Sequence, residues 1–225
     1  VRGGGIGNAA TIVTPSGVGD DDKGRGVRLE SHTQFRPKDS EGTERDGVLR
    51  FELPDKVIAK QTIFYEGLLM GMDLGVSKDG WVYLAERNRI LRVRDTNGDG
   101  KADGPPKHLV KEISTRKFNQ ARGVDHATNG IRMGIDGWIY VAIGDFGFVD
   151  AEGTDGTKVT MYGGGVIRVR PAGTELATYV HGSRNIYDAA LHPVMHIYTR
   201  RNTQPRRALY TRLPPDVPPA PDRSP

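Results

Sequence analysis

At 225 residues the chain is long enough to bury a hydrophobic core, but 36% hydrophobic residues with 30 glycines and 14 prolines favour many turns over long helices. The absence of cysteine excludes disulfides, thiolate metal ligands, a cysteine nucleophile and covalent haem attachment through cysteines. No apolar run reaches the roughly 18 residues of a membrane-spanning helix, and no basic-then-apolar signal peptide opens the sequence.

The formal charge of +4 is concentrated at one end of the chain. Residues 1–199 are neutral overall, whereas residues 200–225 carry six arginines opposed only by Asp216 and Asp222. The same segment holds seven of the 14 prolines, a composition that does not pack into a core. We therefore expect residues 204–225 to form an Arg/Pro-rich disordered tail. We expect no nucleic-acid partner, because the body of the chain is neutral.

The N-terminal segment is rich in glycine and acidic residues, with polar clusters at Asp20–Lys23 and Lys38–Gly42. Such stretches favour loops over packed strands. We expect residues 1–46 to form a separate loop region with a short edge strand near Ser31–Phe35.

A strand pattern marked by tyrosine recurs along the rest of the chain. Asp79–Ala85 (DGWVYLA) returns as Asp136–Ala142 (DGWIYVA) and, more weakly, as His196–Thr199, with the tyrosines 57 and then 58 residues apart. Asp-Gly before the tryptophan is a hairpin-turn signal, because glycine tolerates positive φ. A repeat of this length indicates arrayed units of supersecondary structure.

A second strand pattern alternates hydrophobic residues with arginine. Period-two alternation places Leu91 and Val93 on one buried face and the neighbouring arginines on the other. An inner strand, a turn and two such outer strands make a propeller blade. We therefore predict an all-β fold, a partial β-propeller of about three four-stranded antiparallel blades over residues 47–203. The remainder of a propeller is an expected partner, because a closed ring normally needs more blades. The pattern occurs at Val48–Glu52, Ile90–Arg94 and Val166–Arg170.

Oxygen-bearing side chains alternate in the loop that follows Arg94. They match the first part of a calcium-binding loop, with oxygen side chains at the first, third, fifth and ninth positions and Gly100 at the sixth. The twelfth position is Pro106, where such loops usually carry a bidentate glutamate. Two alternatives follow: a structural Ca²⁺ site that stiffens the loop, or an Asp/Asn/Gly turn that binds nothing. The candidate metal ligands are Asp95, Asn97, Asp99, Lys101 and Asp103.

Two further segments carry candidate catalytic residues. His126 precedes one predicted strand and Asp145 follows the next, so we expect them to meet at one end of a hairpin. A histidine oriented by a carboxylate is what a general base needs near neutral pH; a purely structural His–Asp pair is the alternative. Arg184 offers a fixed fork of donors for an oxyanion, and Asn185 can both donate and accept hydrogen bonds. An exposed surface loop is the alternative there.

These segments resemble, in order, the family of soluble quinoprotein glucose and sorbosone dehydrogenases. The likeness covers roughly residues 47–203. The sequences of Asp136–Tyr140 and Tyr187–Pro193 are more similar still to those of the large dehydrogenase-like propeller proteins of planctomycete-type bacteria. The segments that carry the family resemblance are Leu84–Val93, similar to "TER…ILRV"; His126–Asp145, similar to the catalytic-histidine segment; Tyr162–Val169, similar to "MGKVLRLN"; and Gly182–Asn185, similar to "GHRN".

The resemblance implies a six-bladed propeller that oxidises a sugar or another alcohol with pyrroloquinoline quinone as cofactor, outside the cytoplasm. It implies that His126 is the general base, that Asp145 orients it, and that Arg184 balances negative charge on the quinone. Arg184 and Asn185 would bind the cofactor.

Two positions depart from the family pattern. Asn129-Gly130 stands where the family has "GR", and Ile186-Tyr187-Asp188 replaces "PQG". The departures favour an alternative function, a non-catalytic β-propeller that serves as a binding or scaffold module of a larger exported protein. The retained set of His126, Asp145, Arg184 and Asn185 favours the enzyme.

Overall fold

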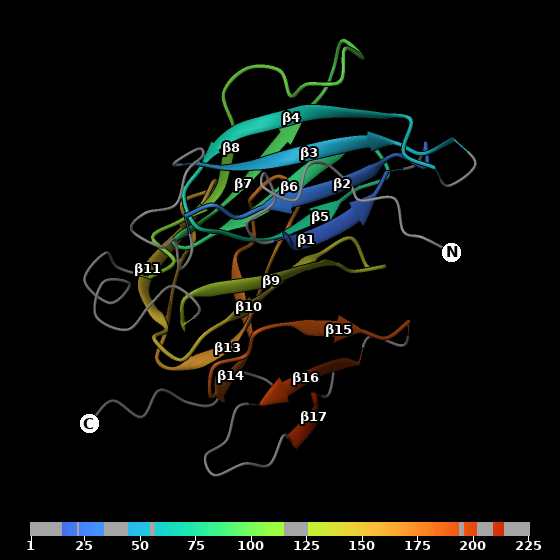
Figure 1. Ribbon diagram of the computed structural model, residues 1–225. Coiled ribbons are helices and arrows are strands. Elements are labelled where there is room, and N and C mark those ends of the chain that lie inside the picture. Colours follow the sequence, from blue (N-terminus) through green and yellow to red (C-terminus); the bar gives the residue numbers. More distant parts are fainter. Residues whose placement is uncertain are drawn as a thin grey trace. The chain divides into compact units, whose positions relative to one another are not determined.

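A computed structural model describes residues 15–21, 23–33, 45–54, 57–114, 126–193, 196–201 and 209–213. Its regular structure is all β-strand and contains no helix within these ranges (Figure 1). The strand pairings within each compact unit are antiparallel. The predicted all-β antiparallel fold class is therefore confirmed. None of the described segments provides a helix that is long and apolar enough to cross a membrane.

The chain divides into two compact units. Unit 1 contains residues 1–86 and 92–107, and unit 2 contains residues 87–91 and 108–225. In unit 1, four strands form a meander in the order β1-β2-β3-β4, and β5 pairs with β6. Its strands are β1 (Pro15–Asp20), β2 (Gly26–Glu30), β3 (Asp46–Glu52), β4 (Lys60–Leu68), β5 (Gly71–Val76) and β6 (Trp81–Glu86), and β7 (Arg89–Arg94) is divided between the units.

Unit 2 contains a four-stranded sheet in the order β14-β13-β10-β9 and a three-stranded sheet in the order β15-β16-β17. The β11–β12 hairpin lies between β10 and β13 in the sequence, and its strand β11 pairs with β8 and not with their sheet. The strands are β8 (Lys107–Lys111), β9 (Thr128–Met133), β10 (Ile139–Ile143), β11 (Phe148–Gly153), β12 (Lys158–Met161), β13 (Gly164–Val169), β14 (Ala177–Ser183), β15 (Ala189–Leu191), β16 (Ile197–Arg201) and β17 (Leu209–Leu213).

The strands predicted from the two repeated patterns all form. Each lies within one or two residues of its predicted bounds, because hydrophobic alternation and the Asp-Gly turns both specify the same hairpins. The strands with the tyrosine pattern are β6, β10 and β16, and those with the arginine pattern are β3, β7 and β13.

The described part of residues 1–46 forms more strand than its composition indicates. β1 and β2 pair with each other, and β2 continues the sheet of β3, so strands on both sides of residue 46 share one sheet. No strand starts at the expected position of Ser31, and Gln34 and Phe35 lie outside the described residues. Glycine at positions 17 and 19 misled the prediction: β1 is closely packed, since a Cβ at Gly17 would lie 2.8 Å from the backbone nitrogen of Leu74.

Strand β17 lies within residues 204–225, the segment expected to be a disordered tail. Five residue pairs join β17 to β16, from Ile197↔Leu213 to Arg201↔Leu209. Main-chain pairing of this kind does not depend on hydrophobic composition, which explains why the proline and arginine content gave no sign of it. The rest of the expected tail lies outside the described residues.

The arginines of β7 and β13 pack against tryptophan. In unit 1 the guanidinium carbons of Arg92 and Arg94 lie 4.3 and 5.7 Å from the centroid of the Trp81 ring. In unit 2 those of Arg168 and Arg170 lie 4.5 and 3.8 Å from Trp138. These are cation–π distances. The repeated "RVR" and "DGW" motifs therefore belong to one structural arrangement, in which two arginines pack on one tryptophan, and each unit contains one example of it.

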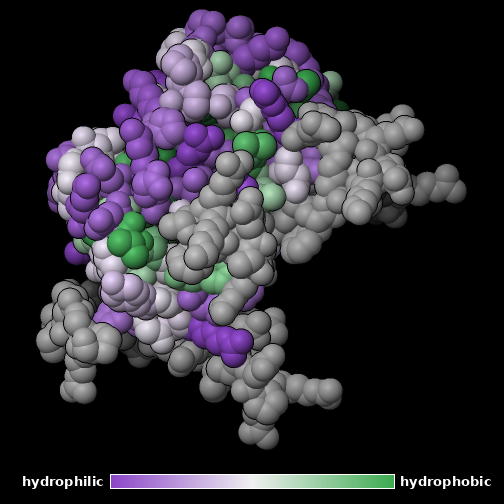
Figure 2. Space-filling view, turned by 90° about the vertical axis from the view of Figure 1, so that its left-hand side faces the viewer, coloured by the Kyte–Doolittle hydropathy of each residue, from purple (hydrophilic) through white to green (hydrophobic). Residues whose placement is uncertain are grey.

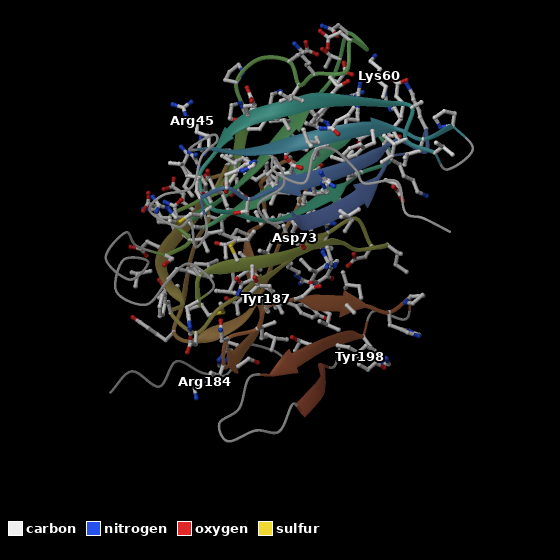
Figure 3. All side chains as sticks on the ribbon, viewed as in Figure 1. Arg45, Lys60, Asp73, Arg184, Tyr187 and Tyr198 are labelled. Carbon is white, nitrogen blue, oxygen red and sulfur yellow. The ribbon has the colours of Figure 1, made fainter. Side chains whose placement is uncertain are left out.

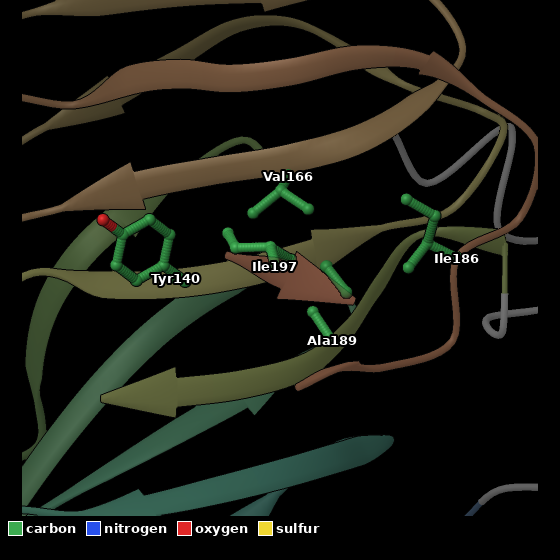
Figure 4. Close-up of a cluster of buried hydrophobic side chains, with 6 residues drawn as sticks. Tyr140, Val166, Ile186, Ala189 and Ile197 are labelled. Carbon is green, nitrogen blue, oxygen red and sulfur yellow. The ribbon is translucent and has the colours of Figure 1, made fainter. Parts of the chain in front are cut away.

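The core of unit 2 contains side chains from both of its sheets (Figure 4). Val166 and Ile197 are fully buried, and Tyr140 packs edge-on against Tyr179 with ring centroids 5.2 Å apart. Burying one such aliphatic side chain contributes about 1.5–3 kcal/mol. On the face in Figure 2, hydrophobic residues of the described surface occur as separate small groups among hydrophilic ones.

Asp46 organises the end of the four-stranded sheet in unit 1. Its side chain is fully buried and accepts hydrogen bonds from the backbone nitrogens of His32 (2.6 Å), Thr33 (2.8 Å) and Gly71 (2.6 Å). The hydroxyl of Thr33 donates another at 2.9 Å. One carboxylate thus connects the chain after β2 to the start of β5.

Replacing Asp46 with alanine should lower the free energy of unfolding by about 3–5 kcal/mol, because it leaves several buried donors unsatisfied. Urea denaturation measures the change. Asp20→Ala is the control, because Asp20 is exposed on β1. Equal losses in the two variants would contradict this role of Asp46.

Tyr140 couples the stability of unit 2 to alkaline pH. Burial raises the pKa of the Tyr140 hydroxyl, and its hydrogen bond to Asp136 (2.7 Å) raises that pKa further. An acid whose pKa is raised on folding contributes stability that is present below its unfolded pKa of about 10 and is lost as the pH rises above it. Tyr140→Phe should cost about 1 kcal/mol at neutral pH. Urea denaturation from about pH 9 to 11 should show a smaller further loss in the variant than in the wild type; parallel losses would contradict the coupling.

Candidate functional site

The β9–β10 hairpin brings His126 and Asp145 together. His126 lies two residues before β9, Asp145 lies two residues after β10, and Thr128 pairs with Ile143 at this end of the hairpin. Nδ1 of His126 is hydrogen-bonded to Oδ1 of Asp145. Both side chains keep contact with solvent, with 27% of His126 and 19% of Asp145 exposed. The arrangement is that of an imidazole oriented by a carboxylate at an accessible surface.

Gly144 permits this approach of the two chain segments. Its backbone nitrogen donates to the carbonyl of Ala127 at 2.6 Å, and Phe146 donates to the carbonyl of His126 at 3.2 Å. A Cβ at position 144 would lie 2.3 Å from the carbonyl carbon of His126, so only glycine fits. The ring of Phe146 also stacks on the imidazole of His126, with centroids 5.0 Å apart and planes 20° apart. Neither role could be recognised from the sequence.

Arg184 reaches the same pair from the end of β14. Its Nε lies 3.8 Å from Oδ2 of Asp145, and 53% of its side chain is exposed. Figure 3 shows Arg184 beside the end of β14, where the chain turns towards Tyr187. The structure thus brings together three of the residues singled out from the sequence: His126, Asp145 and Arg184.

Asn185 directly follows Arg184 in the sequence and is buried, with 9% of its surface exposed. Its backbone has a φ of 35°, and its amide oxygen has no hydrogen-bond partner among the described residues. A left-handed conformation is tolerated better by asparagine than by most residues. A buried acceptor of this kind usually has a partner, so Asn185 is a suitable group for holding a ligand.

The two departures from the quinoprotein pattern contact each other. Asn129 donates its amide to the carbonyl of Ile186 at 2.7 Å, and the backbone nitrogen of Gly130 donates to the carbonyl of Tyr187 at 3.0 Å. A Cβ at Gly130 would lie 2.4 Å from Oδ1 of Asp188. β9 therefore holds the chain that directly follows Arg184 and Asn185, and the changed residues form part of its support.

The loop proposed to bind calcium is held together by its own hydrogen bonds. Oδ1 of Asp95 accepts from the backbone nitrogen of Gly98, and Oδ2 accepts from that of Gly100 (2.7 and 3.1 Å). Nη1 of Arg50 lies 2.8 Å from the same Oδ2. Burial acts to raise the pKa of Asp95, but the hydrogen bonds from Arg50, Gly98 and Gly100 outweigh it and lower the pKa overall.

The remaining candidate metal ligands belong to the same network. Asp99 accepts from the backbone nitrogen of Lys101, Asn97 accepts from that of Asp99, and Asp103 accepts from Thr96. The hydrogen bonds from Thr96 lower the pKa of Asp103. In the described part of the chain, no group of three or more histidine or acidic residues is placed to hold a metal ion. Calcium binding at this loop stays a prediction that the structure does not support.

Comparison with known proteins identifies the family. The model for "Domain of unknown function (DUF7133)" matches residues 31–217, which include both units' repeats and the whole His126 cluster. The chain belongs to the DUF7133 family. No curated protein matches this DUF7133 chain.

Solved structures share its fold at low sequence identity. A PQQ-bound aldose sugar dehydrogenase from Streptomyces coelicolor aligns with a TM-score of 0.61 and 17% identity, over 92% of this chain and 62% of that one. The PQQ domain of a pyranose dehydrogenase from Coprinopsis cinerea gives 0.56 and 12%, over 89% and 48%. A gluconolactonase from Xanthomonas campestris gives 0.56 and 14%, over 84% and 55%. The DUF7133 chain therefore has a β-propeller-like fold and spans about half to three-fifths of the length of these structures.

Gly130→Ala should displace the segment that follows Asn185 and destabilise the DUF7133 chain by about 1–3 kcal/mol, because the added methyl group overlaps Asp188. Urea denaturation and hydrogen exchange of residues 184–188 measure the two effects. Gly47→Ala is the matched control, since a Cβ there meets only the carbonyl oxygen of Tyr65 at 3.4 Å. A loss no larger than that of the control, with unchanged exchange, would exclude the supporting role of Gly130.

Proposed function

We propose that this chain carries the proton-transfer site of a quinone-dependent dehydrogenase that oxidises a sugar or another alcohol. The observation that carries the proposal is the convergence of His126, Asp145 and Arg184 at one end of the β9–β10 hairpin. The fold shared with a PQQ-bound aldose sugar dehydrogenase and the resemblance of residues 47–203 to quinoproteins both support it. An exported location is part of the proposal, because quinoproteins of this type work outside the cytoplasm.

His126 is the general base in this proposal. Since its Nδ1 is hydrogen-bonded to Asp145, the ring is oriented so that Nε2 takes the proton of the substrate hydroxyl. The carboxylate of Asp145 then stabilises the imidazolium that forms. Phe146, stacked on the ring, restricts its rotation. With about a quarter of His126 exposed, a small substrate can reach the imidazole while much of the surrounding water is excluded.

Arg184 and Asn185 are suited to hold part of pyrroloquinoline quinone, a planar group with quinone oxygens and carboxylates. The half-exposed guanidinium of Arg184 offers donors to those oxygens, and the unused amide oxygen of the buried Asn185 can accept from the pyrrole N–H of the cofactor. When bound, the cofactor accepts the hydride from the carbon that bears the hydroxyl. Arg184, which lies 3.8 Å from Asp145, places positive charge beside the same carboxylate. It therefore links cofactor binding to the proton-transfer pair.

His126→Ala should lower the rate of dye reduction with aldoses by about 10²–10⁴-fold, the usual contribution of a general base. The wild-type chain, loaded with pyrroloquinoline quinone and Ca²⁺, gives the reference rate. Quinone binding, followed by titration calorimetry, should be retained in His126→Ala and weakened in Arg184→Ala. The calorimetry therefore distinguishes a variant that has lost the proton-transfer step from one that no longer binds the cofactor.

Two matched variants serve as controls for this experiment. His181→Ala removes an exposed histidine of β14, and Arg170→Ala removes an arginine that packs on Trp138. Both should keep the wild-type affinity for the quinone. A wild-type chain that binds no quinone would refute the cofactor assignment and support the non-catalytic binding or scaffold module. An active His126→Ala variant would exclude the proposed base.

A further inference from the structure

Unit 1 contains a cavity that takes no part in the proposed reaction. Its volume is about 290 Å³, which is at the lower end of the range for small-molecule sites. The β1–β2 turn, the middle of β3 and β4, the β5–β6 turn and the end of β7 provide its walls. Among the described residues that line it, five are cationic and three are carboxylates: Lys23, Arg25, Arg50, Lys78 and Arg94, and Asp21, Asp79 and Asp95.

Local donors already satisfy the carboxylates of this cavity. Asp21 accepts from the backbone nitrogens of Lys23 and Arg25 and forms an ion pair with Arg25. Asp95 pairs with Arg50, as described above, and accepts two backbone hydrogen bonds of its own loop. Asp79 accepts from the hydroxyl of Ser77. Two of the five cations are therefore neutralised within the wall.

The other three cations, Lys23, Lys78 and Arg94, form no ion pair within the described segments. Lys23 and Lys78 are exposed at the rim. Arg94 is half-buried, and its guanidinium carbon lies 5.7 Å from the centroid of the Trp81 ring, within cation–π range. Three unpaired positive charges against Asp79 leave the described lining residues with an excess of positive charge, which attracts anions.

The rest of the lining is apolar. Val27 and Val82 are buried, and Phe64 is 3% exposed with the guanidinium of Arg50 over its ring at 5.3 Å. Arg50 is itself 7% exposed, so a buried charged side chain also contributes to the wall. Apolar surface beside a few directed charges is typical of sites for small organic ligands.

We propose that this cavity binds a small organic anion, whose carboxylate or phosphate group is held by Lys23, Lys78 and Arg94 and whose apolar part contacts Val27, Phe64 and Val82. Carboxylates and phosphates share the acceptor geometry that a guanidinium recognises with two parallel hydrogen bonds. The volume limits the ligand to a small molecule. This assignment does not depend on the function proposed for His126, because every residue that it uses belongs to unit 1.

Titration calorimetry with butyrate and with inorganic phosphate, at constant ionic strength set by sodium chloride, tests the assignment. At least one anion should bind with one-to-one stoichiometry and raise Tm. Preference for butyrate would indicate a carboxylate ligand, and preference for phosphate would indicate a phosphorylated one. Lys78→Glu should weaken binding by about tenfold or more, because it removes one charge-assisted hydrogen bond and adds a repulsive charge.

Lys60→Glu is the matched control, because Lys60 is an exposed lysine of the same unit that does not line the cavity. It should leave the affinity unchanged. Lys78 is exposed, so its replacement should also leave Tm without ligand unchanged. Absence of binding by both anions would overturn the proposal. Binding that Lys78→Glu and Lys60→Glu weaken equally would overturn it as well, since it would reflect overall charge and not this cavity.

Discussion

The close approach of two backbones at Gly144 is the constraint on which the candidate site depends. The chain before β9 and the chain after β10 are joined there by main-chain hydrogen bonds, from Gly144 to Ala127 and from Phe146 to His126. This contact leaves no space for a side chain at position 144. Because backbone atoms fix the separation, the His126–Asp145 pair does not rely on flexible side chains for its position. Such preorganisation is what electrostatic and acid–base catalysis require.

Short-range patterns were sufficient to predict most strands. In β7, Leu91 and Val93 are buried while Arg92 and Arg94 are only partly buried, as period-two alternation indicated. The same pattern could not show what the arginines contact, because their partner Trp81 lies in β6 and belongs to a different motif. β1 and β17 were missed for a related reason: main-chain pairing holds both strands, and composition does not encode it.

The part of the candidate site that could be predicted is the part set by the positions where strands begin and end. His126 and Asp145 flank a hairpin, so their meeting could be expected from topology. The support of Arg184 and Asn185 could not, because it depends on Asn129 and Gly130 contacting residues 186–188, more than fifty positions away. These contacts also change how the departures from the quinoprotein pattern are understood. The residues that differ from that pattern at two places in the sequence contact each other in the structure. Together they form one alternative way of supporting the segment after Asn185, and they do not represent two independent losses of cofactor-binding residues.

The two tryptophans of the chain have a spectroscopic consequence. Trp81 belongs to unit 1 and Trp138 to unit 2, and arginine cations stack on both indoles. Unfolding of a unit removes its cations from its indole and exposes the ring to water. Each unit therefore contains its own fluorophore. A chain with only one of the two indoles would allow the emission of a single unit to be followed, so that the melting of the two halves could be resolved in one cuvette.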